Sequence, residues 1–359
     1  MAYTDIDKPS DYFNTLLYTG DNSNRSFTGV GFQPDLTWIK ARNNTTWHLL
    51  YDAVRTAGTG KELHSNSTAA EGASNSSLYG YLSSFDSDGF STVNGSSSSD
   101  ALNETGKTYA AWNWKAGGSA SSNSNGSITS SVSANTTSGF SIVSYTGNGS
   151  AGATIGHGLS QKPSIIITKR RDSISNWLVY SSELGATKYL ELETTNAGQT
   201  ATSRWNDTEP TSSVFSVGTS TSANPSSGTM IAYCFAEKQG YSKFGSYTGN
   251  GNADGTFVYT GFKPAFFLWK QSSASGQQWY MLDNKRNLFN PSNNFLQPSN
   301  SDAEYTGSSY PVDFLSNGIK IRTSSAGWNT SGQTYIYMAF AENPFVATSG
   351  TSAVPVTAR

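Results

Sequence analysis

The chain has 359 residues with 13% charged and 13% aromatic side chains, and its formal net charge at pH 7 is −2. A nearly neutral chain has no broad basic field to attract a polyanion, which argues against nucleic acid as a main ligand. Few charges together with many aromatic, Ser, Thr, Asn and Gly residues favour short strands joined by polar turns and argue against disorder.

A single cysteine and the lack of long apolar runs narrow the class of protein further. Cys234 alone cannot form an intrachain disulfide or a Cys-based zinc site, so we expect the fold to be stable by packing alone. Because there is no run of about 18 apolar residues, we expect no transmembrane helix. Residues 1–10 lack the basic-then-apolar order of a signal peptide, and we expect no membrane insertion.

One phrase, in which a Gly and a Pro precede an apolar run closed by Lys, occurs three times. It reads GFQPDLTWIK at 31–40, GLSQKPSIIITK at 158–169 and GFKPAFFLWK at 261–270. Each copy is preceded by Tyr-Thr-Gly and followed by a second phrase that contains a tryptophan. A repeat of about 100 residues is too long for a solenoid module and long enough for a small domain with its own core.

We therefore predict an all-β chain of three tandem antiparallel β-sandwich domains of the jelly-roll kind. Unit one spans residues 1–116, unit two 139–240 and unit three 241–345. The Ser/Asn/Gly-rich stretch 117–138 is predicted to be a linker or a loosely held strand. Residues 346–359 are predicted to be an extended, exposed tail.

Unit one contains one helix candidate and one hairpin candidate. DAVRTAG at 52–58 is the best candidate for a short helix in a chain without a sustained helical period. Asp86 and Asp88 resemble the opening of a calcium loop, but the residues after Gly89 lack the remaining ligands. Because unit three has Ser-Asn-Gly at the same place, we predict a hairpin turn here.

Unit two provides the clearest strand patterns. SIIIT at 164–168 is apolar at consecutive positions, which predicts a strand covered on both faces. KYLELE at 188–193 alternates, which predicts one face in water, and its Glu191 and Glu193 would project from the same face. His157 lies in a Gly-His-Gly turn and is expected at the surface.

Unit three repeats these patterns, since AFFLW at 265–269 again predicts a strand covered on both faces. Each unit ends with an apolar run that predicts a closing strand. These runs are YAAWNWK at 109–115, MIAYCFAE at 230–237 and YIYMAFAE at 335–342.

Tryptophans recur at shared positions in the repeated phrases. An exposed tryptophan can stack on a sugar ring, but a position that recurs beside aliphatic residues favours core packing. We therefore expect these side chains to be buried: Trp38, Trp47, Trp177, Trp269 and Trp279.

The longer phrases resemble a known family. YTGNGS, KPSIIITK, RWNDTEPTSSVFSVG, the stretch from AYCFAEKQGYSKFGSYTG to GFKPAF, and YIYMAFAENPF are similar to a family of repeated-domain virion proteins of tailed phages, especially those of aquatic bacteria. The resemblance covers about residues 11–359. It implies a structural protein of the phage particle, located in the virion, with lectin-like β-sandwich domains, and it implies no active site.

Residues that differ between the units are the candidates for ligand binding, because shared positions build the scaffold and loops on a rigid sandwich commonly carry binding. Tryptophan faces beside Asn, Asp and Arg suit hydroxyl-rich ligands, although such loops can also only satisfy each other. The candidates are Arg204, Trp205, Asn206, Asp207 and Glu209 in unit two, and Asp283, Asn284, Lys285, Arg286 and Asn290 in unit three.

Enzymatic chemistry has little support in the sequence. Glycoside cleavage needs two carboxylates about 5–9 Å apart, and the candidate pairs are Glu191 with Glu193 and Asp207 with Glu209. No nucleophile elbow, phosphate loop or dinucleotide fingerprint is present, and the three histidines lack metal-ligand spacing. We expect no enzymatic activity, no cofactor and no metal.

Three functions remain open at this point. The first is a tail-fibre or appendage component that contacts host surface polysaccharide, together with other virion proteins and as a homo-oligomer, with a trimer as the usual fibre symmetry. The second is a head decoration (cement) protein on the capsid exterior, whose segment 346–359 adds a strand to a neighbour. The third is a carbohydrate-active enzyme.

Overall fold

The computed structural model describes residues 4–97 and 101–346. Nearly all the regular structure in these residues consists of strands in antiparallel sheets, which confirms the predicted all-β class. The two α-helices in this part of the chain have four residues each, and neither is long enough to cross a bilayer.

Unit one forms one large and one small sheet. Its elements are η1 (Pro9–Asp11), β1 (Phe13–Thr19), β2 (Arg25–Thr28), β3 (Leu36–Ala41), β4 (Leu49–Asp52), β5 (Leu63–His64), α1 (Ser76–Tyr79), β6 (Tyr81–Asp86), β7 (Gly89–Val93) and β8 (Thr108–Trp114). The large sheet has the order β1-β8-β3-β4-β5 and the small sheet β2-β7-β6. The predicted hairpin joins β6 to β7 and is confirmed, and the Asp88 carboxylate accepts the N–H groups of Gly29 and Gly31.

Unit two also has a large and a small sheet, with eight and two strands. Its elements are β9 (Ser121–Asn123), β10 (Ser130–Asn135), β11 (Phe140–Thr146), β12 (Ala153–Gly156), β13 (Ile165–Arg170), β14 (Trp177–Ser181), β15 (Lys188–Glu191), β16 (Gln199–Thr200), α2 (Thr202–Trp205), β17 (Val214–Val217) and β18 (Thr229–Phe235). The large sheet has the order β16-β15-β14-β13-β18-β11-β10-β9, and β12 pairs with β17.

Unit three has a large sheet of four strands and a small sheet of three. Its elements are β19 (Ser242–Thr248), β20 (Phe257–Tyr259), β21 (Phe262–Gln271), β22 (Trp279–Asp283), β23 (Val312–Leu315), β24 (Gly318–Ile321) and β25 (Thr334–Pro344). The large sheet has the order β19-β25-β21-β22 and the small sheet β20-β24-β23.

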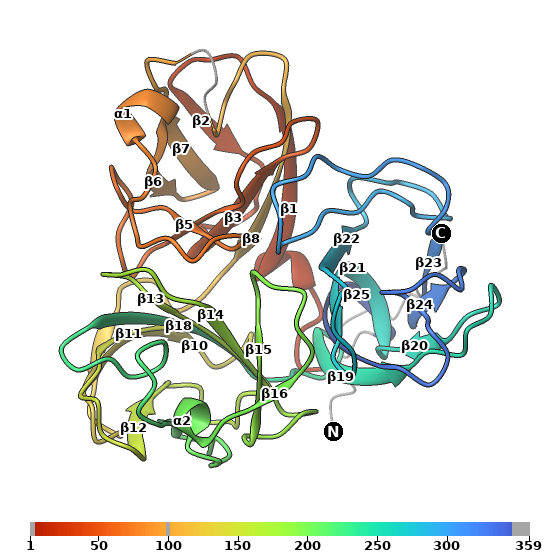
Figure 1. Ribbon diagram of the computed structural model, residues 1–359. Coiled ribbons are helices and arrows are strands. Elements are labelled where there is room, and N and C mark those ends of the chain that lie inside the picture. The colour runs from red at the N-terminus through yellow and green to blue at the C-terminus, as the bar shows by residue number, and fades with distance from the viewer. Residues whose placement is uncertain (1–3, 98–100, 347–359) are drawn as a thin grey trace.

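The same order of four strands therefore occurs in all three large sheets: β1-β8-β3-β4, β11-β18-β13-β14 and β19-β25-β21-β22. In each case the first strand of the unit pairs with its closing strand, which pairs with the strand of the repeated Gly/Pro phrase, which pairs with the strand that follows it. Figure 1 shows the three units as three lobes around a common centre, with unit one in red and orange, unit two in yellow and green, and unit three in cyan and blue.

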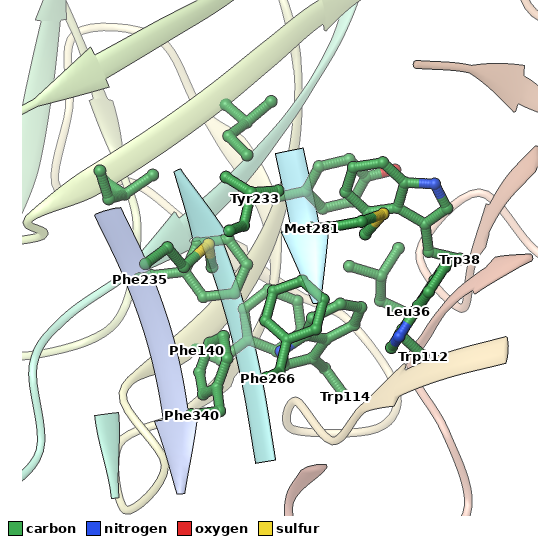
Figure 2. Packing of buried hydrophobic residues seen from close by; sticks show 14 of the residues in the cluster. Leu36, Trp38, Trp112, Trp114, Phe140, Tyr233, Phe235, Phe266, Met281 and Phe340 are labelled. Atoms are coloured by element: carbon green, nitrogen blue, oxygen red, sulfur yellow. The ribbon is translucent and has the colours of Figure 1, made fainter. Parts of the chain in front are cut away.

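Both faces of each large sheet are buried, as the apolar runs predict. One face is buried by residues of the same unit, and the other is buried by residues of the other two units. On the first of these faces each unit has its own buried cluster between the large and the small sheet. The opposite faces of the three sheets meet in a fourth, central cluster that draws buried residues from all three units. Figure 2 shows this cluster, in which Trp114, Phe235, Phe266 and Phe340 lie together. Burying each such side chain contributes about 1.5–3 kcal/mol.

Two stretches of unit two can be compared with their predictions. The stretch 117–138 was predicted to be a linker or a loosely held strand, and within it Ser130–Asn135 forms a strand that pairs with β11 along its whole length and buries Val132. The alternating run 188–193 was expected to have one face in water, yet Tyr189, Leu190 and Glu191 are all buried. Tyr189 packs in the cluster of unit two, Leu190 packs in the central cluster, and the Glu191 carbonyl accepts the indole N–H of Trp279 from unit three.

Residues 52–58 and His157 also differ from expectation. Residues 52–58 form bends and no helix, because Asp52 accepts the backbone N–H of Arg55 and closes a turn. His157 is fully buried rather than exposed, and its Nδ1 accepts the N–H of Leu159.

The units meet at three related junctions, in which the same backbone contact recurs. The N–H of Glu71 donates to Arg171 (2.8 Å) between units one and two. The N–H of Glu304 donates to Arg42 (2.6 Å) between units three and one, and that of Gly198 to Ser272 (2.8 Å) between units two and three. The contacts therefore run in one direction around the centre and close a ring.

The junction between units three and one is ionic and buried. Arg286 and Asp283 form a fully buried ion pair, and Trp112 of unit one donates its indole N–H to the same carboxylate at 2.9 Å. Burial alone would raise the pKa of Asp283, but Arg286 holds it below its usual value. Glu304 then links Arg286 (2.9 Å) to Arg42 of unit one (2.8 Å).

The junction between units one and two repeats this network with other residues. Asp52 pairs with Arg55, the Tyr233 hydroxyl donates to Asp52 at 2.7 Å, and Glu71 links Arg55 to Arg171.

The junction between units two and three is apolar instead. By strand register, Ser181, Leu184, Gly198 and Ser272 take the places of Asp283, Arg286, Glu304 and Arg42. Met338 takes the place of Trp112, which donates its indole N–H at the junction between units three and one. Leu184 and Met338 both belong to the central cluster. The charged groups are thus present together or absent together, which avoids an unpaired buried charge.

This comparison predicts the effect of breaking one junction. Arg286→Leu leaves Asp283 and Glu304 without their buried cation and should lower the free energy of unfolding by about 3–5 kcal/mol. A variant with four of the residues found at the apolar junction, Asp283→Ser, Arg286→Leu, Glu304→Gly and Arg42→Ser, should regain at least half of that loss, because no charged group is then left without its partner. Urea unfolding measures both. A cost below about 1 kcal/mol for the single variant would show that the ion pair does not hold the junction.

Candidate functional site

The best candidate site lies where the loop between β3 and β4 meets unit three. In units two and three the strand register places Trp177 opposite Lys169 and Trp279 opposite Lys270. In unit one Ile39 pairs with Leu49, so the residue opposite Lys40 is His48 and not Trp47. The tryptophan of unit one is therefore displaced by one residue.

This displacement moves Trp47 to the surface. Core packing is confirmed for Trp38, Trp177, Trp269 and Trp279, which are all buried. It is wrong for Trp47, whose side chain is 43% exposed. The spacing from the phrase proline to the tryptophan does not reveal this displacement, because it is 13, 14 and 15 residues in the three units and the tryptophans of units two and three both lie opposite the lysine.

His48 takes the buried place that the tryptophans occupy elsewhere. Trp177 and Trp279 donate their indole N–H groups to backbone carbonyls of the preceding unit, at His64 and Glu191. His48 accepts the indole N–H of Trp38 at 3.0 Å. Burial lowers the pKa of His48 well below its ordinary value, so this imidazole is neutral.

Trp47 forms one wall of a pocket of about 360 Å³. One side of its ring packs against His64, with the ring centroids 4.7 Å apart. The walls come from the loop between β3 and β4, from α1, from the segment before β8 and from unit three. The lining residues are Asn44, Thr45, Thr46, Trp47, Tyr79, Ala101, Glu104 and Ser301.

The polar groups of the pocket are held in place by other side chains. Asn44 donates its amide to a carboxylate oxygen of Glu104 at 3.3 Å, and Lys107 lies 3.8 Å from the other oxygen of Glu104. The N–H of Thr46 donates to the carbonyl of Ser301 at 3.1 Å, which attaches the loop to unit three. A pocket fixed in this way loses little conformational entropy when a ligand binds.

Lys40 holds the loop between β3 and β4 in place through hydrogen bonds to its backbone. Its side chain is buried, and its ammonium group donates to the carbonyls of Ala41 (2.7 Å) and Asn44 (2.9 Å). Burial lowers the pKa of Lys40 to about 8. The equivalent Lys169 and Lys270 are buried in the same way, and burial lowers the pKa of each to about 8.

The chemistry of the pocket suits a hydroxyl-rich ring. An exposed indole offers an apolar face for stacking, while amide, carboxylate and hydroxyl groups at its edge can exchange hydrogen bonds with hydroxyls. Its volume falls in the usual range for small-molecule sites, about 300–1,000 Å³.

The unit two candidates from the sequence lie elsewhere and mostly bind each other. Trp205 is buried and packs edge-on against Tyr180, which leaves no ring face for a ligand. Arg204 lies 4.8 Å over the ring of Tyr189 and donates to the hydroxyl of Ser220.

The remaining residues of that loop close it on itself. Asn206 adopts the left-handed conformation that ends α2, and Asp207 accepts the hydroxyl of Thr202 at 2.6 Å. Glu209 accepts from Lys162 at 2.8 Å and from the Tyr180 hydroxyl. Burial would raise the pKa of Glu209, but these hydrogen bonds outweigh it and lower the pKa.

The unit three candidates are largely structural. Asp283 and Arg286 form the buried junction pair, and Asn290 uses its side-chain amide to exchange two hydrogen bonds with the backbone of Phe314. Asn284 is buried and lines a separate cavity of about 60 Å³, together with the exposed Lys285. None of the ten candidates lines the Trp47 pocket.

The acidic pair of unit two is also engaged by protein donors. Glu193 accepts from the Asn176 amide (2.7 Å) and the Trp177 N–H (3.1 Å), and burial raises its pKa to about 7. Glu191 accepts from Asn196 at 3.2 Å. Neither residue lines the Trp47 pocket.

The buried lysines predict an unusual pH dependence. Between pH 8 and 10 the unfolded chain keeps protons on lysine that the folded chain has lost, so lysine titration makes the folded state more stable as pH rises. Lys40→Met should reduce the slope of unfolding free energy against pH by about 1 kcal/mol per pH unit in this window. Exposed Lys188→Met is the control, and denaturant unfolding from pH 8 to 10 is the measurement. An unchanged slope for Lys40→Met would contradict the assigned pKa.

Comparison with known proteins identifies a family. Residues 8–344 match the model of a family described as "Domain of unknown function (DUF7483)". No curated protein and no solved structure matches the chain. Because the match covers nearly all of its length, the chain belongs to the DUF7483 family.

Proposed function

We propose that the protein is a non-enzymatic structural component of a phage virion, part of a tail fibre or another appendage, and that it contacts glycans of the host surface. The observation that carries the proposal is the exposed ring of Trp47 in a pocket with Tyr79, Asn44 and Glu104. The similarity of the repeated phrases to virion proteins of tailed phages supports the location.

The pocket fits a role in adhesion. One stacking ring with a few hydrogen-bonding groups gives weak binding to a single sugar. Many copies on one particle raise the effective concentration, so weak contacts add up to firm attachment. Homo-oligomerisation and contacts with other virion proteins would supply those copies.

The proposed architecture is three copies of one antiparallel, lectin-like β-sandwich. It is supported by the strand order that recurs in the three large sheets and by the small sheet that faces each of them. Such scaffolds bind ligands with residues that are not repeated, which fits the displacement of Trp47 in unit one alone.

Substitution of the exposed ring tests the proposal. The purified protein should block adsorption of the phage to its host, and Trp47→Ala should weaken that blocking about tenfold or more, because exposed aromatic anchors carry much of the energy of an interface. The melting temperature should change little, since the ring is already 43% exposed.

Ile174→Ala is the matched control, because Ile174 is 76% exposed and belongs to the corresponding loop of unit two. Equal blocking by Trp47→Ala and the unchanged protein would show that the pocket takes no part in host recognition.

A second candidate function is head decoration on the capsid exterior. Five of the eight exposed large hydrophobic side chains of the described residues belong to unit three: Phe257, Tyr259, Leu288, Phe289 and Phe345. Exposed apolar groups on one part of a surface favour contact with another protein, such as a capsid shell. An antibody against this chain, located on particles by negative-stain microscopy, separates the two functions, because label on the tail supports the first and label on the head supports the second.

A further inference from the structure

The Trp47 pocket carries charge of one sign. Among its lining residues that the structure describes, Glu104 is the only acidic or basic one. Two cations of unit one lie close by but outside the lining. The buried ammonium group of Lys40 donates to the backbone carbonyl of Asn44, and Lys107 lies beside Glu104. The pocket therefore favours a neutral or positively charged ligand over an anionic one.

The protein itself uses only part of the Glu104 carboxylate. Its Oε2 accepts the amide of Asn44 at 3.3 Å, whereas its Oε1 lies 3.8 Å from the Nζ of Lys107, which is too long for a hydrogen bond. The side chains of Glu104 and Lys107 are 18% and 29% exposed, and loose ion pairs near the surface contribute little to stability. An ammonium group of a ligand can thus reach Oε1 at hydrogen-bond distance and displace Lys107 at small cost.

Asn44 adds a second acceptor to the same wall. An ionised carboxylate only accepts hydrogen bonds, so the part of Asn44 that faces Glu104 is its NH₂ group, and its side-chain carbonyl oxygen remains for a ligand. An ammonium group has three N–H donors and no acceptor, whereas a sugar hydroxyl both donates and accepts. A wall in which acceptors are in excess therefore matches an ammonium group better than a hydroxyl.

The aromatic walls favour a cation as well. Trp47 and the partly exposed Tyr79 both line the pocket, and the face of an aromatic ring attracts positive charge. An ammonium group is about as large as a water molecule, which takes about 30 Å³ in the liquid. Most of the pocket's volume of about 360 Å³ is therefore left for the ring that carries the amine.

We propose that the Trp47 pocket binds sugar residues that carry a free, protonated amino group, with the sugar ring stacked on Trp47 and the ammonium group hydrogen-bonded to Glu104. This assignment rests on the proposed contact with glycans and narrows it to cationic amino sugars. A neutral sugar leaves Glu104 without a charged partner, and an acidic sugar brings a second negative charge next to it.

Titration of the full chain with single sugars tests the assignment. At pH 6 glucosamine and galactosamine should bind at least tenfold more tightly than glucose and N-acetylglucosamine, because hydrogen bonds between charged groups are the strong ones. Glucuronic acid should bind most weakly. Both amino sugars are used because the proposal fixes the amine and not the arrangement of the hydroxyls. The indole N–H signals in NMR spectra of the ¹⁵N-labelled protein give the dissociation constants.

Three variants locate the source of the preference. Glu104→Gln should bring the affinities for glucosamine and glucose within about twofold of each other, since an amide oxygen still accepts from Asn44 but carries no charge. Asp5→Asn removes one exposed charge outside the pocket lining and is the matched control, which should keep the preference. Lys107→Met removes the competing cation and should tighten glucosamine binding about twofold or more. Melting curves establish that the variants are folded.

Three outcomes overturn the assignment, and they separate it from the proposed function. Glucose or glucuronic acid that binds as tightly as glucosamine, with binding lost in Trp47→Ala, would exclude selection for the amine and leave contact with glycans standing. Methylammonium that binds as tightly as glucosamine would assign the pocket to a cation without a sugar ring. Absence of binding by all five sugars would exclude sugars from the pocket. If Trp47→Ala then also blocks adsorption as well as the unchanged protein, the proposed function fails too.

Discussion

The structure depends on the burial of a second face on each of its three large sheets. A sheet covered on one face only would leave Trp114, Phe235, Phe266 and Phe340 in water. Here these side chains meet those of the other units in one central cluster. Each unit has its own smaller core as well, so stability comes from two sources: packing within each unit and packing among the three.

This central packing brings polar groups to the junctions, where each needs a partner. Backbone carbonyls of one unit accept the indole N–H groups of the next, and buried lysines bond to carbonyl groups across the same boundaries. Two junctions use a buried acid–arginine network and the third uses Leu184 and Met338. In unit one His48 occupies the indole position, and the displaced Trp47 becomes the exposed ring of the pocket. The candidate site thus arises where unit one differs from the packing that units two and three share.

The sequence predicts the local structure better than the contacts among units. The repeated phrases and consecutive apolar runs correctly indicate β-strands covered on both faces, because that pattern is local. They cannot indicate that the second cover is another unit. For the same reason Asp283 and Arg286 resemble a polar binding loop, since nothing in their spacing reveals a buried pair. The one-residue displacement of Trp47 depends on strand register, which the spacing of the phrases does not reveal.

If the central cluster joins the three units into one body, they must unfold together. Native-state hydrogen exchange at increasing denaturant measures the opening free energy of individual amides. We expect the most protected amides of β8, β18 and β25, one closing strand from each unit, to converge on a single opening free energy. Separate values, with one unit opening well before the other two, would contradict this expectation.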